Sequence, residues 1–341
     1  MPAPRNSPPR AAVLGLGMMG RHHTRILQSS PRFVFAGAVD PAGDAHGALH
    51  DPALLHPSLD ALLAAGAPDL VVVALPTEDH SSAAIALAQA GVHLLIEKPL
   101  AASVEEGRAI VAACEEAGVL GAVGHVERFN PALVELRRRM ALGQLGEVVT
   151  VATERLGPFP DRVRDVGVIK DLATHDLDLV RWIADAPIAS LAAETSHKLG
   201  RPHEDLVAMT GRLANGIVFN VQVDWLTPTK VRRARVVGER GMLLANMLTA
   251  DLTWVANGTV ASEWAAARAL RGVSEGDSTR YALARREPLL AELEAFCDRV
   301  EGDEDAPVVS LRHGLEVLAF AEAALESASR HETVVLAQAR K

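Results

Sequence analysis

A histidine and three aspartates stand in a segment that otherwise predicts a buried helix, "GVIKDLATHDLDLVRW", residues 167–182. Wound at about 100° per residue, Asp171, His175 and Asp178 gather on one stripe of that helix. Asp171 and His175 are one helical turn apart, so their side chains can touch. A carboxylate bonded to one imidazole nitrogen raises the basicity of the other nitrogen. The pair is typical of a general base for an alcohol, and the structural alternative is a capped helix whose polar face meets water.

A lysine at the end of a predicted buried strand is the second candidate for chemistry. Glu97-Lys98-Pro99 comes directly after the apolar run "VHLLI". Ligands of parallel sheets bind beyond the carboxyl ends of the strands, so Lys98 should point into a cofactor crevice. Pro99 restricts the backbone of Lys98 and so limits the direction of its side chain. Spacing alone leaves open that Lys98 is an ordinary solvated lysine after an edge strand. Glu97 beside it could be an ion partner or a ribose ligand.

A glycine-rich turn predicts the cofactor. "GLGMMG" fits the pattern G-x-G-x-x-G, follows a predicted strand and opens a predicted helix. Asp40 ends the next strand, which completes the context of a dinucleotide fingerprint. A carboxylate there binds ribose hydroxyls and repels a 2′-phosphate, so NAD is predicted over NADP. The predicted contacts are Gly15, Gly17, Met18, Met19, Gly20 and Asp40, although the two methionines also suit a core position.

Two loops add candidate contacts. "LPTEDH", residues 75–80, follows the third predicted strand and should lie near the nicotinamide half of the cofactor. Capping of the next helix by Thr77 or Asp79 is its structural alternative. The predicted cofactor contacts in and near this loop are Leu75, Pro76, Thr77, His80, Glu97 and Lys98.

"GHVERFNP", residues 124–131, closes the nucleotide-binding part of the chain. Asn130 and Pro131 form a standard helix start, with asparagine as the cap and proline at the first position. His125 and Arg128 have no such structural role, so they are candidate substrate contacts. Asn130 remains a further candidate, as does Asp178 on the helix described above.

The first third of the chain predicts a parallel sheet. Five apolar, β-branched runs alternate with alanine-rich amphipathic stretches: "AAVLGLG", "FVFAGAVD", "DLVVVALP", "VHLLIEKP" and "GVLGAVGH". Continuous apolar strands between helices indicate a sheet that is covered on both faces. We therefore expect a Rossmann-type, doubly wound α/β domain over residues 11–125, after a disordered, proline-rich lead-in at residues 1–10.

The pattern changes after residue 125. "GIVFNVQVDW" alternates strictly between apolar and polar residues, which predicts a half-buried antiparallel strand. Asn215-Gly216 and Asn257-Gly258 are two-residue hairpin signals, and "TVATER", "LVAMTGRL", "VRRARVVG" and "MLLANML" supply further strands. Residues 126–341 should thus form an α+β domain with an open, mainly antiparallel sheet for substrate binding and oligomerisation. Its helix over 311–328 should pack back toward the first domain.

Composition excludes several classes of protein. The chain has 341 residues and a formal charge of −9, from 34 basic and 43 acidic side chains. That balance argues against nucleic-acid partners and against anionic membranes. The two cysteines fit no metal or redox pattern, and the N-terminus has no apolar run that would predict a signal peptide. We expect a cytoplasmic protein that acts on a small molecule and uses no metal.

Several of these motifs together resemble the Gfo/Idh/MocA family of pyridine-nucleotide oxidoreductases: "GLGMMGRHH", "LPTEDH" with "AGVHLLIEKPL", "GHVERFNP" and "DLATHDLDL". The resemblance implies a Rossmann domain joined to an open-sheet domain that carries substrate and oligomer contacts, so a homodimer or homotetramer is expected. It also implies a catalytic group that falls on Lys98, Asp171 and His175. Lys98 would stabilise the alkoxide, His175 would remove the hydroxyl proton, and Asp171 would orient the histidine.

Within the family, "GHVERFNPA" and "GVIKDLATHDLDL" are most similar to the enzymes that oxidise the 3-hydroxyl of UDP-N-acetylglucosamine. The segment "RLGPFPDRVRD" offers Arg155, Arg162 and Arg164 to a diphosphate. Two alternatives stay open: an inositol or unactivated-sugar dehydrogenase, and an NAD-binding sensor without turnover. The Lys98, Asp171 and His175 set argues against the sensor, because a regulator needs no base.

Overall fold

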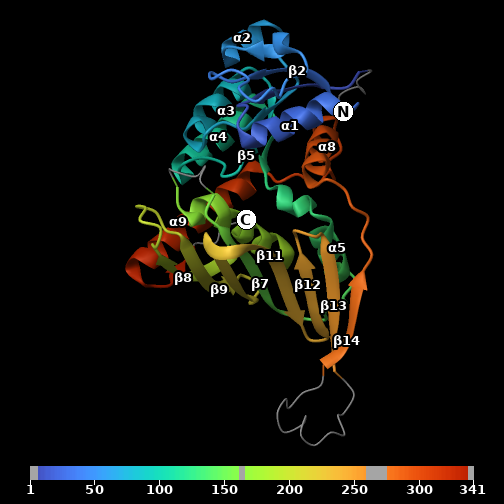
Figure 1. The fold of residues 1–341 in the computed structure, drawn as a ribbon, viewed down its shortest axis with the longest axis vertical. Coiled ribbons are helices and arrows are strands. Elements are labelled where there is room, and N and C mark those ends of the chain that lie inside the picture. Colours follow the sequence, from blue (N-terminus) through green and yellow to red (C-terminus); the bar gives the residue numbers. More distant parts are fainter. Residues whose placement is uncertain (1–6, 161–165, 259–274, 337–341) are drawn as a thin grey trace, which may run out of the picture. The chain divides into compact units, whose positions relative to one another are not determined.

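The computed structural model describes residues 7–160, 166–258 and 275–336 (Figure 1). The chain divides into an N-terminal unit, Met1–Val126 with Leu289–Ala319, and a C-terminal unit, Glu127–Pro288 with Phe320–Lys341. Residues 1–6 of the expected disordered lead-in lie outside the described residues. Arg10 already belongs to the first strand, and its backbone amide donates to Asp69 at 2.7 Å.

The N-terminal unit contains a six-stranded parallel sheet in the order β3-β2-β1-β4-β5-β6. The strands are β1 (Arg10–Leu14), β2 (Val34–Val39), β3 (Leu55–His56), β4 (Leu70–Val73), β5 (His93–Glu97) and β6 (Gly121–Gly124). Its helices are α1 (Met18–Ser29), α2 (Leu59–Ala64), α3 (His80–Gln89), α4 (Val104–Ala117), α8 (Pro288–Val300) and the first part of α9 (Leu311–Arg330). The strand order reverses between β1 and β4, which is where such folds bind ligands. The predicted doubly wound fold is confirmed.

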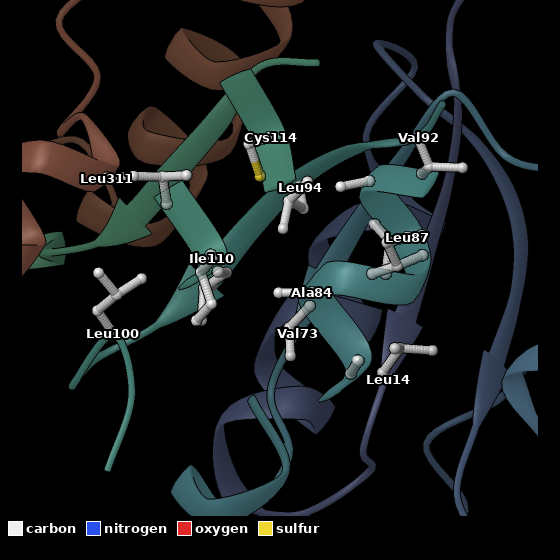
Figure 2. Close-up of a cluster of buried hydrophobic side chains, with 14 of the residues drawn as sticks. Leu14, Val73, Ala84, Leu87, Val92, Leu94, Leu100, Ile110, Cys114 and Leu311 are labelled. Atoms are coloured by element: carbon white, nitrogen blue, oxygen red, sulfur yellow. The ribbon is translucent and has the colours of Figure 1, made fainter. Parts of the chain in front are cut away.

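Both faces of this sheet are buried, because each central strand is apolar at consecutive positions. Leu14, Val73 and Leu94 face a core completed by α3 and α4, as Figure 2 shows. The alternate residues, such as Val13 and Val72, face a second core with α1 and α8. Continuous β-branched runs are therefore required here, and they made this half of the fold predictable.

Helix α8 differs from the expectation for the C-terminal part of the chain. Its residues follow the second domain in sequence, yet Leu289, Leu293 and Phe296 pack in the core of the N-terminal unit. The physical reason is that the β1–β4 face opposite α3 and α4 needs an apolar cover beyond α1. Helix α9 likewise packs Leu311 and Leu318 against the first core, whereas Ser327 bonds the Ala193 amide of the C-terminal unit at 2.9 Å.

The C-terminal unit contains a nine-stranded sheet in the order β14-β13-β12-β11-β7-β10-β9-β8-β15. Its strands are β7 (Val148–Pro158), β8 (Ile188–Ser196), β9 (Leu206–Leu213), β10 (Val218–Asp224), β11 (Leu226–Gly238), β12 (Gly241–Asn246), β13 (Asp251–Asn257), β14 (Glu275–Tyr281) and β15 (Val334–Val335). Helix α5 (Pro131–Ala141) packs on β12 and β13, and α6 (Thr174–Ala184) on β7 and β10. The sheet is mainly antiparallel, as predicted, with β7 and β10 as a parallel pair.

Strand β10 shows the predicted alternation as far as Val223, whereas Asp224, expected on the polar face, is buried. Phe219, Val221 and Val223 are buried, whereas Asn220 and Gln222 are exposed in this single chain. Whether the exposed face pairs with a second subunit stays a prediction.

The two hairpin signals have different outcomes. Asn215-Gly216 lies in the hairpin that joins the antiparallel strands β9 and β10, as predicted, but the connection is longer than two residues, because the Leu213 amide bonds the Ile217 carbonyl. The prediction for Asn257-Gly258 is wrong as a two-residue hairpin, because β13 ends at Asn257 and its antiparallel partner begins only at Glu275. An Asn-Gly pair permits a tight turn but does not require one.

Both thiols are buried, Cys114 beside the first core and Cys297 in the second. Burial raises the pKa of each thiol to about 11. In the folded protein we expect neither thiol to react with a disulfide reagent at mildly alkaline pH. The thiolate is the nucleophile, and at that pH both buried thiols stay protonated. Both thiols should react after unfolding in guanidinium. Rapid modification of the folded protein, measured by the released thiolate chromophore, would contradict this burial.

No helix among the described residues is both long and apolar enough to cross a membrane. Helix α9 is long, but several charged side chains interrupt it.

Candidate active site

The glycine turn has the geometry of a dinucleotide loop. Gly15 has φ +89°, and a Cβ there would lie 2.5 Å from the carbonyl oxygen of Ala74 at the end of β4. A Cβ on Gly20 would collide with the Gly15 carbonyl, so α1 approaches the turn too closely for any side chain. These two glycines therefore serve the backbone itself.

Gly17 and Asp40 test whether a dinucleotide fits this turn. A Cβ on Gly17 would meet no protein atom within 4 Å, so the turn is open on that side. Gly17 begins α1 without a side-chain cap, and the first turn of α1 carries no acidic residue. Its free amides and positive dipole end suit a pyrophosphate. Asp40 accepts bonds from the Leu16 and Ala42 amides at 2.7 and 2.8 Å, which fixes its carboxylate beside the turn. The residues fit the group.

The contrast between two glycines gives a prediction. Gly17→Ala should keep the wild-type melting temperature and weaken NAD binding strongly, because its methyl group enters only the space that the pyrophosphate needs. Gly20→Ala should instead lower the melting temperature, because its methyl group strikes the Gly15 carbonyl. Thermal unfolding and NAD titration of both variants separate the two roles. Unaltered NAD affinity in folded Gly17→Ala would exclude the predicted pyrophosphate position.

In the loop after β4, neither Thr77 nor Asp79 caps the next helix with its side chain. Thr77 lies in a short 3-10 turn, Thr77–Asp79, and neither this turn nor α3 has a side-chain cap. His80 begins α3 and is buried, with ring nitrogens 3.0 Å from the carbonyl oxygens of Leu75 and Pro99. Burial lowers the pKa of His80. Both ring nitrogens of His80 already face backbone carbonyl oxygens of the protein. Direct contact of His80 with NAD therefore stays a prediction.

Lys98 stands at the carboxyl end of β5 between two fixed neighbours. Glu97 is buried, and one of its oxygens lies 2.8 Å from Nε2 of His23 on α1. Burial raises the pKa of Glu97, but His23 and the positive charge of Lys98 outweigh that effect and hold the pKa below its usual value. The other oxygen accepts the Lys98 amide at 3.2 Å, and the Lys98–Pro99 peptide is cis. The glycine turn, Asp40 and Lys98 therefore all lie at the carboxyl ends of one sheet.

The predicted catalytic helix begins irregularly. Asp171 lies in a π-helical turn, Ile169–Ala173, and His175 is the second residue of α6. The Thr174 amide bonds the Ile169 carbonyl, five residues back, so the rotation of about 100° per residue assumed from the sequence fails here. Asp171 is 9% exposed and Asp178 is 1% exposed. His175 is partly exposed, so the two aspartates of this face are buried within the protein while the histidine keeps some access to its surface.

Glu204, from the loop before β9, holds the start of this segment. One of its carboxylate oxygens accepts the Ile169 amide at 2.9 Å, and its carbonyl oxygen accepts the Val168 amide at 3.0 Å. An anion at this end also complements the helix dipole. A Cβ on Gly167 would lie 2.1 Å from the Glu204 carboxylate, so a side chain there would displace this carboxylate.

Two predicted substrate ligands bind each other. Arg128 makes a two-pronged ion pair with Asp178, at 2.8 and 2.5 Å, and its guanidinium lies 5.7 Å from the Trp182 ring centre. The arginine is fixed by these contacts. Arg128 and Asp178 therefore brace α6, and direct substrate binding by either one stays a prediction.

Arg155 is also committed to carboxylates. It is 4% exposed, and it bonds Asp176 at 2.5 Å and Glu127 at 2.8 Å. Arg232 lies directly opposite Arg155 on β11, where the charges of Asp176, Glu127 and Asp171 act on it. The positive and negative groups of this cluster compensate each other, so it does not by itself require an anionic ligand. Arg162 and Arg164 lie outside the described residues.

The remaining candidates are placed as follows. Asn130 caps α5 by accepting the Ala132 amide at 3.1 Å, and it donates to the Met247 carbonyl at 3.0 Å. Its structural role is confirmed. His125 is buried just beyond β6. Among the described residues, no group of three or more His, Cys, Asp or Glu side chains is arranged to hold a metal ion.

Several residues that fix the candidate site are not identified by the sequence, among them His23, Glu204 and Arg232. His23 was visible only as the last histidine of "GRHH", and its partner Glu97 is far away in sequence. Glu204 and Arg232 carry no local signal. A strand residue that faces a helix becomes identifiable only when the neighbouring strand and its register are known.

Comparisons with known proteins agree with this geometry. The family model "Oxidoreductase family, NAD-binding Rossmann fold" of the Gfo/Idh/MocA proteins matches residues 9–125, and the model of their C-terminal domain matches residues 133–244. The UDP-N-acetylglucosamine 3-dehydrogenase of Acidithiobacillus ferrooxidans is 31% identical over 294 residues, which cover 85% of this chain and 88% of the relative. Inositol 2-dehydrogenase 2 of Saccharopolyspora erythraea is 31% identical over 220 residues, covering 62% and 65%.

A solved structure of the Acidithiobacillus ferrooxidans enzyme has a TM-score of 0.82 with this chain, at 29% identity. The match covers 94% of this chain and 98% of that one.

Proposed function

Because the chain belongs to the Gfo/Idh/MocA family of NAD-dependent oxidoreductases, we propose that it oxidises the 3-hydroxyl of UDP-N-acetylglucosamine to a 3-keto sugar. The observation that carries the substrate is the match to the UDP-N-acetylglucosamine 3-dehydrogenase, which extends over 85% of this chain. The chemistry is supported by Lys98 at the end of β5, by the buried Asp171 and by the partly exposed His175 at the start of α6.

The roles in this proposal are those that the family resemblance implies. Bound NAD supplies an acceptor for the hydride that leaves the reacting carbon. Lys98 donates a hydrogen bond to the reacting oxygen and stabilises the negative charge that develops on it. His175 accepts the hydroxyl proton, and Asp171 orients and charge-balances the resulting imidazolium.

Residues of the glycine turn hold the cofactor in this proposal. The α1 amides bind the pyrophosphate, and Asp40 binds the adenosine ribose. The further contacts in this proposal are Met18 and Met19 in the first turn of α1 and Leu75, Pro76 and Thr77 after β4.

A second candidate is an inositol dehydrogenase, and the 31% identity to an inositol 2-dehydrogenase supports it. An uncharged polyol would also suit the charge-compensated cluster around Arg155. The shorter coverage of that relative, 62% of this chain against 85%, favours the sugar nucleotide.

NADH formation tests the proposal. Purified protein is supplied with NAD and either UDP-N-acetylglucosamine, its galacto epimer, free N-acetylglucosamine or myo-inositol. A parallel set includes an oxoacid acceptor, which reveals turnover if the cofactor never leaves the protein. Turnover with UDP-sugars alone is expected. Turnover with inositol alone would contradict the proposed substrate. If no NADH forms with any substrate while NAD still binds, the sensor is favoured.

A further inference from the structure

We propose that His80 is a positioning residue for Lys98, which it serves by tying the strand end that carries Lys98 to the neighbouring loop after β4. The proposal rests on the proposed function, because it requires Lys98 to act on the substrate. It assigns to His80 a role other than contact with the cofactor.

His80 replaces the strand pairing where that pairing stops. Strands β4 and β5 are paired as far as Val73 and Ile96, and beyond this point their chains separate into two loops. His80 is 1% exposed, and its Nε2 lies 3.0 Å from the Leu75 carbonyl oxygen. Its Nδ1 lies 3.0 Å from the Pro99 carbonyl oxygen. One imidazole therefore bridges both loops at the carboxyl edge of the sheet.

The chemistry of the ring suits this bridge. A neutral imidazole has one N–H, which can donate to either carbonyl, and a protonated ring donates to both. Burial favours the neutral ring, whereas the two carbonyls and the Glu97 charge favour the protonated one. In each state at least one loop is held by an N–H bond. Few other side chains span such a gap with a polar atom at each edge of a rigid ring.

A second histidine anchors the other side of Lys98. His23 of α1 bonds the buried Glu97 carboxylate, while His80 of α3 bonds the Pro99 carbonyl. Both neighbours of Lys98 are thus fixed to histidines that come from different helices. The backbone of Lys98 is held on both sides, so the reach of its ammonium group is set by its own side-chain torsions.

Three variants test the bridge. His80→Leu removes both polar edges, His80→Gln keeps one donor, and His93→Leu removes a histidine at the opposite end of β5, where it accepts the Leu120 amide. We expect kcat to fall roughly 10²-fold in His80→Leu, because a displacement of about 1 Å at the reacting group costs that much. The KM for UDP-N-acetylglucosamine and the NAD affinity should change little, and His80→Gln should recover part of kcat.

The control separates positioning from folding. His93→Leu should lower the melting temperature without lowering kcat. The proposal is wrong if His80→Leu retains the kcat of His93→Leu, or if both His80 variants lose NAD binding in proportion to kcat.

A readout independent of turnover covers failure of the proposed substrate. Reductive methylation followed by mass spectrometry gives the modification rate of Lys98 relative to exposed Lys230 in each folded variant. The ratio should change in His80→Leu, return toward wild type in His80→Gln, and stay at the wild-type value in His93→Leu. An unchanged ratio in His80→Leu would overturn the bridge. If the wild-type protein forms no NADH with UDP-N-acetylglucosamine, only the proposed function is contradicted.

Discussion

Lys98→Met is expected to lower kcat by roughly 10²–10³-fold, the loss typical of removing one group that stabilises a developing oxyanion. Methionine keeps much of the length and apolar stem of lysine but has no N–H to donate. The Lys98 backbone amide and its bond to Glu97 remain, so the strand end should keep its shape. NAD affinity should therefore stay close to the wild-type value. Steady-state rates with UDP-N-acetylglucosamine and an NAD titration measure both quantities.

Lys198→Met is the matched control, because Lys198 is exposed and lies in the other unit. It should retain wild-type kcat. Lys98→Arg should not rescue the activity, since a planar guanidinium presents its donors in a different geometry. Wild-type kcat in Lys98→Met would remove Lys98 from the mechanism.

His175→Asn should lower kcat by roughly 10²–10⁴-fold, the range over which a positioned acid or base contributes. A general base works without its proton, so the wild-type rate should fall as the pH drops below the pKa of that base. The variant should lose this acid limb, because asparagine does not titrate. Its rate should thus become less dependent on pH as well as slower. Rates measured across the pH range test both changes.

Two further variants interpret that result. Asp171→Asn keeps the shape of the side chain and removes the charge, so the acid limb should shift while part of the activity remains. His197→Asn, at an exposed position, should leave kcat and the pH profile unaltered. A His175→Asn variant that is slow yet keeps the wild-type acid limb would place the base elsewhere.

The sequence predicted the N-terminal unit well because its signal is redundant. Val13, Val72 and Leu95 are apolar, and so are their neighbours in the chain, since both faces of the sheet are covered. No choice of register is needed to read such strands. The glycine turn was equally readable, because a close backbone approach at Gly15 and Gly20 excludes other residues.

The candidate site was less predictable, because residue types do not reveal partners. Arg128 and Asp178 were each interpreted as substrate ligands, and the structure pairs them with each other. Arg155 was also interpreted as a substrate ligand, and in the structure it donates a hydrogen bond to the buried Asp176. The π-helical turn at Asp171 was also invisible, since an apolar pattern that fits a helical period does not reveal one added backbone position.

The return of α8 to the first core has a consequence for the order of folding during synthesis. Leu289, Leu293 and Phe296 cover one face of the parallel sheet, and they leave the ribosome only after almost the whole C-terminal unit has been made. Until then α1 alone covers that face, and the part of it that α8 buries lacks its apolar partner. Closing the N-terminal core also requires contacts between residues very distant in sequence, which slows folding. The nascent N-terminal unit therefore exposes apolar surface for most of translation, and chaperones can bind this surface until α8 covers it.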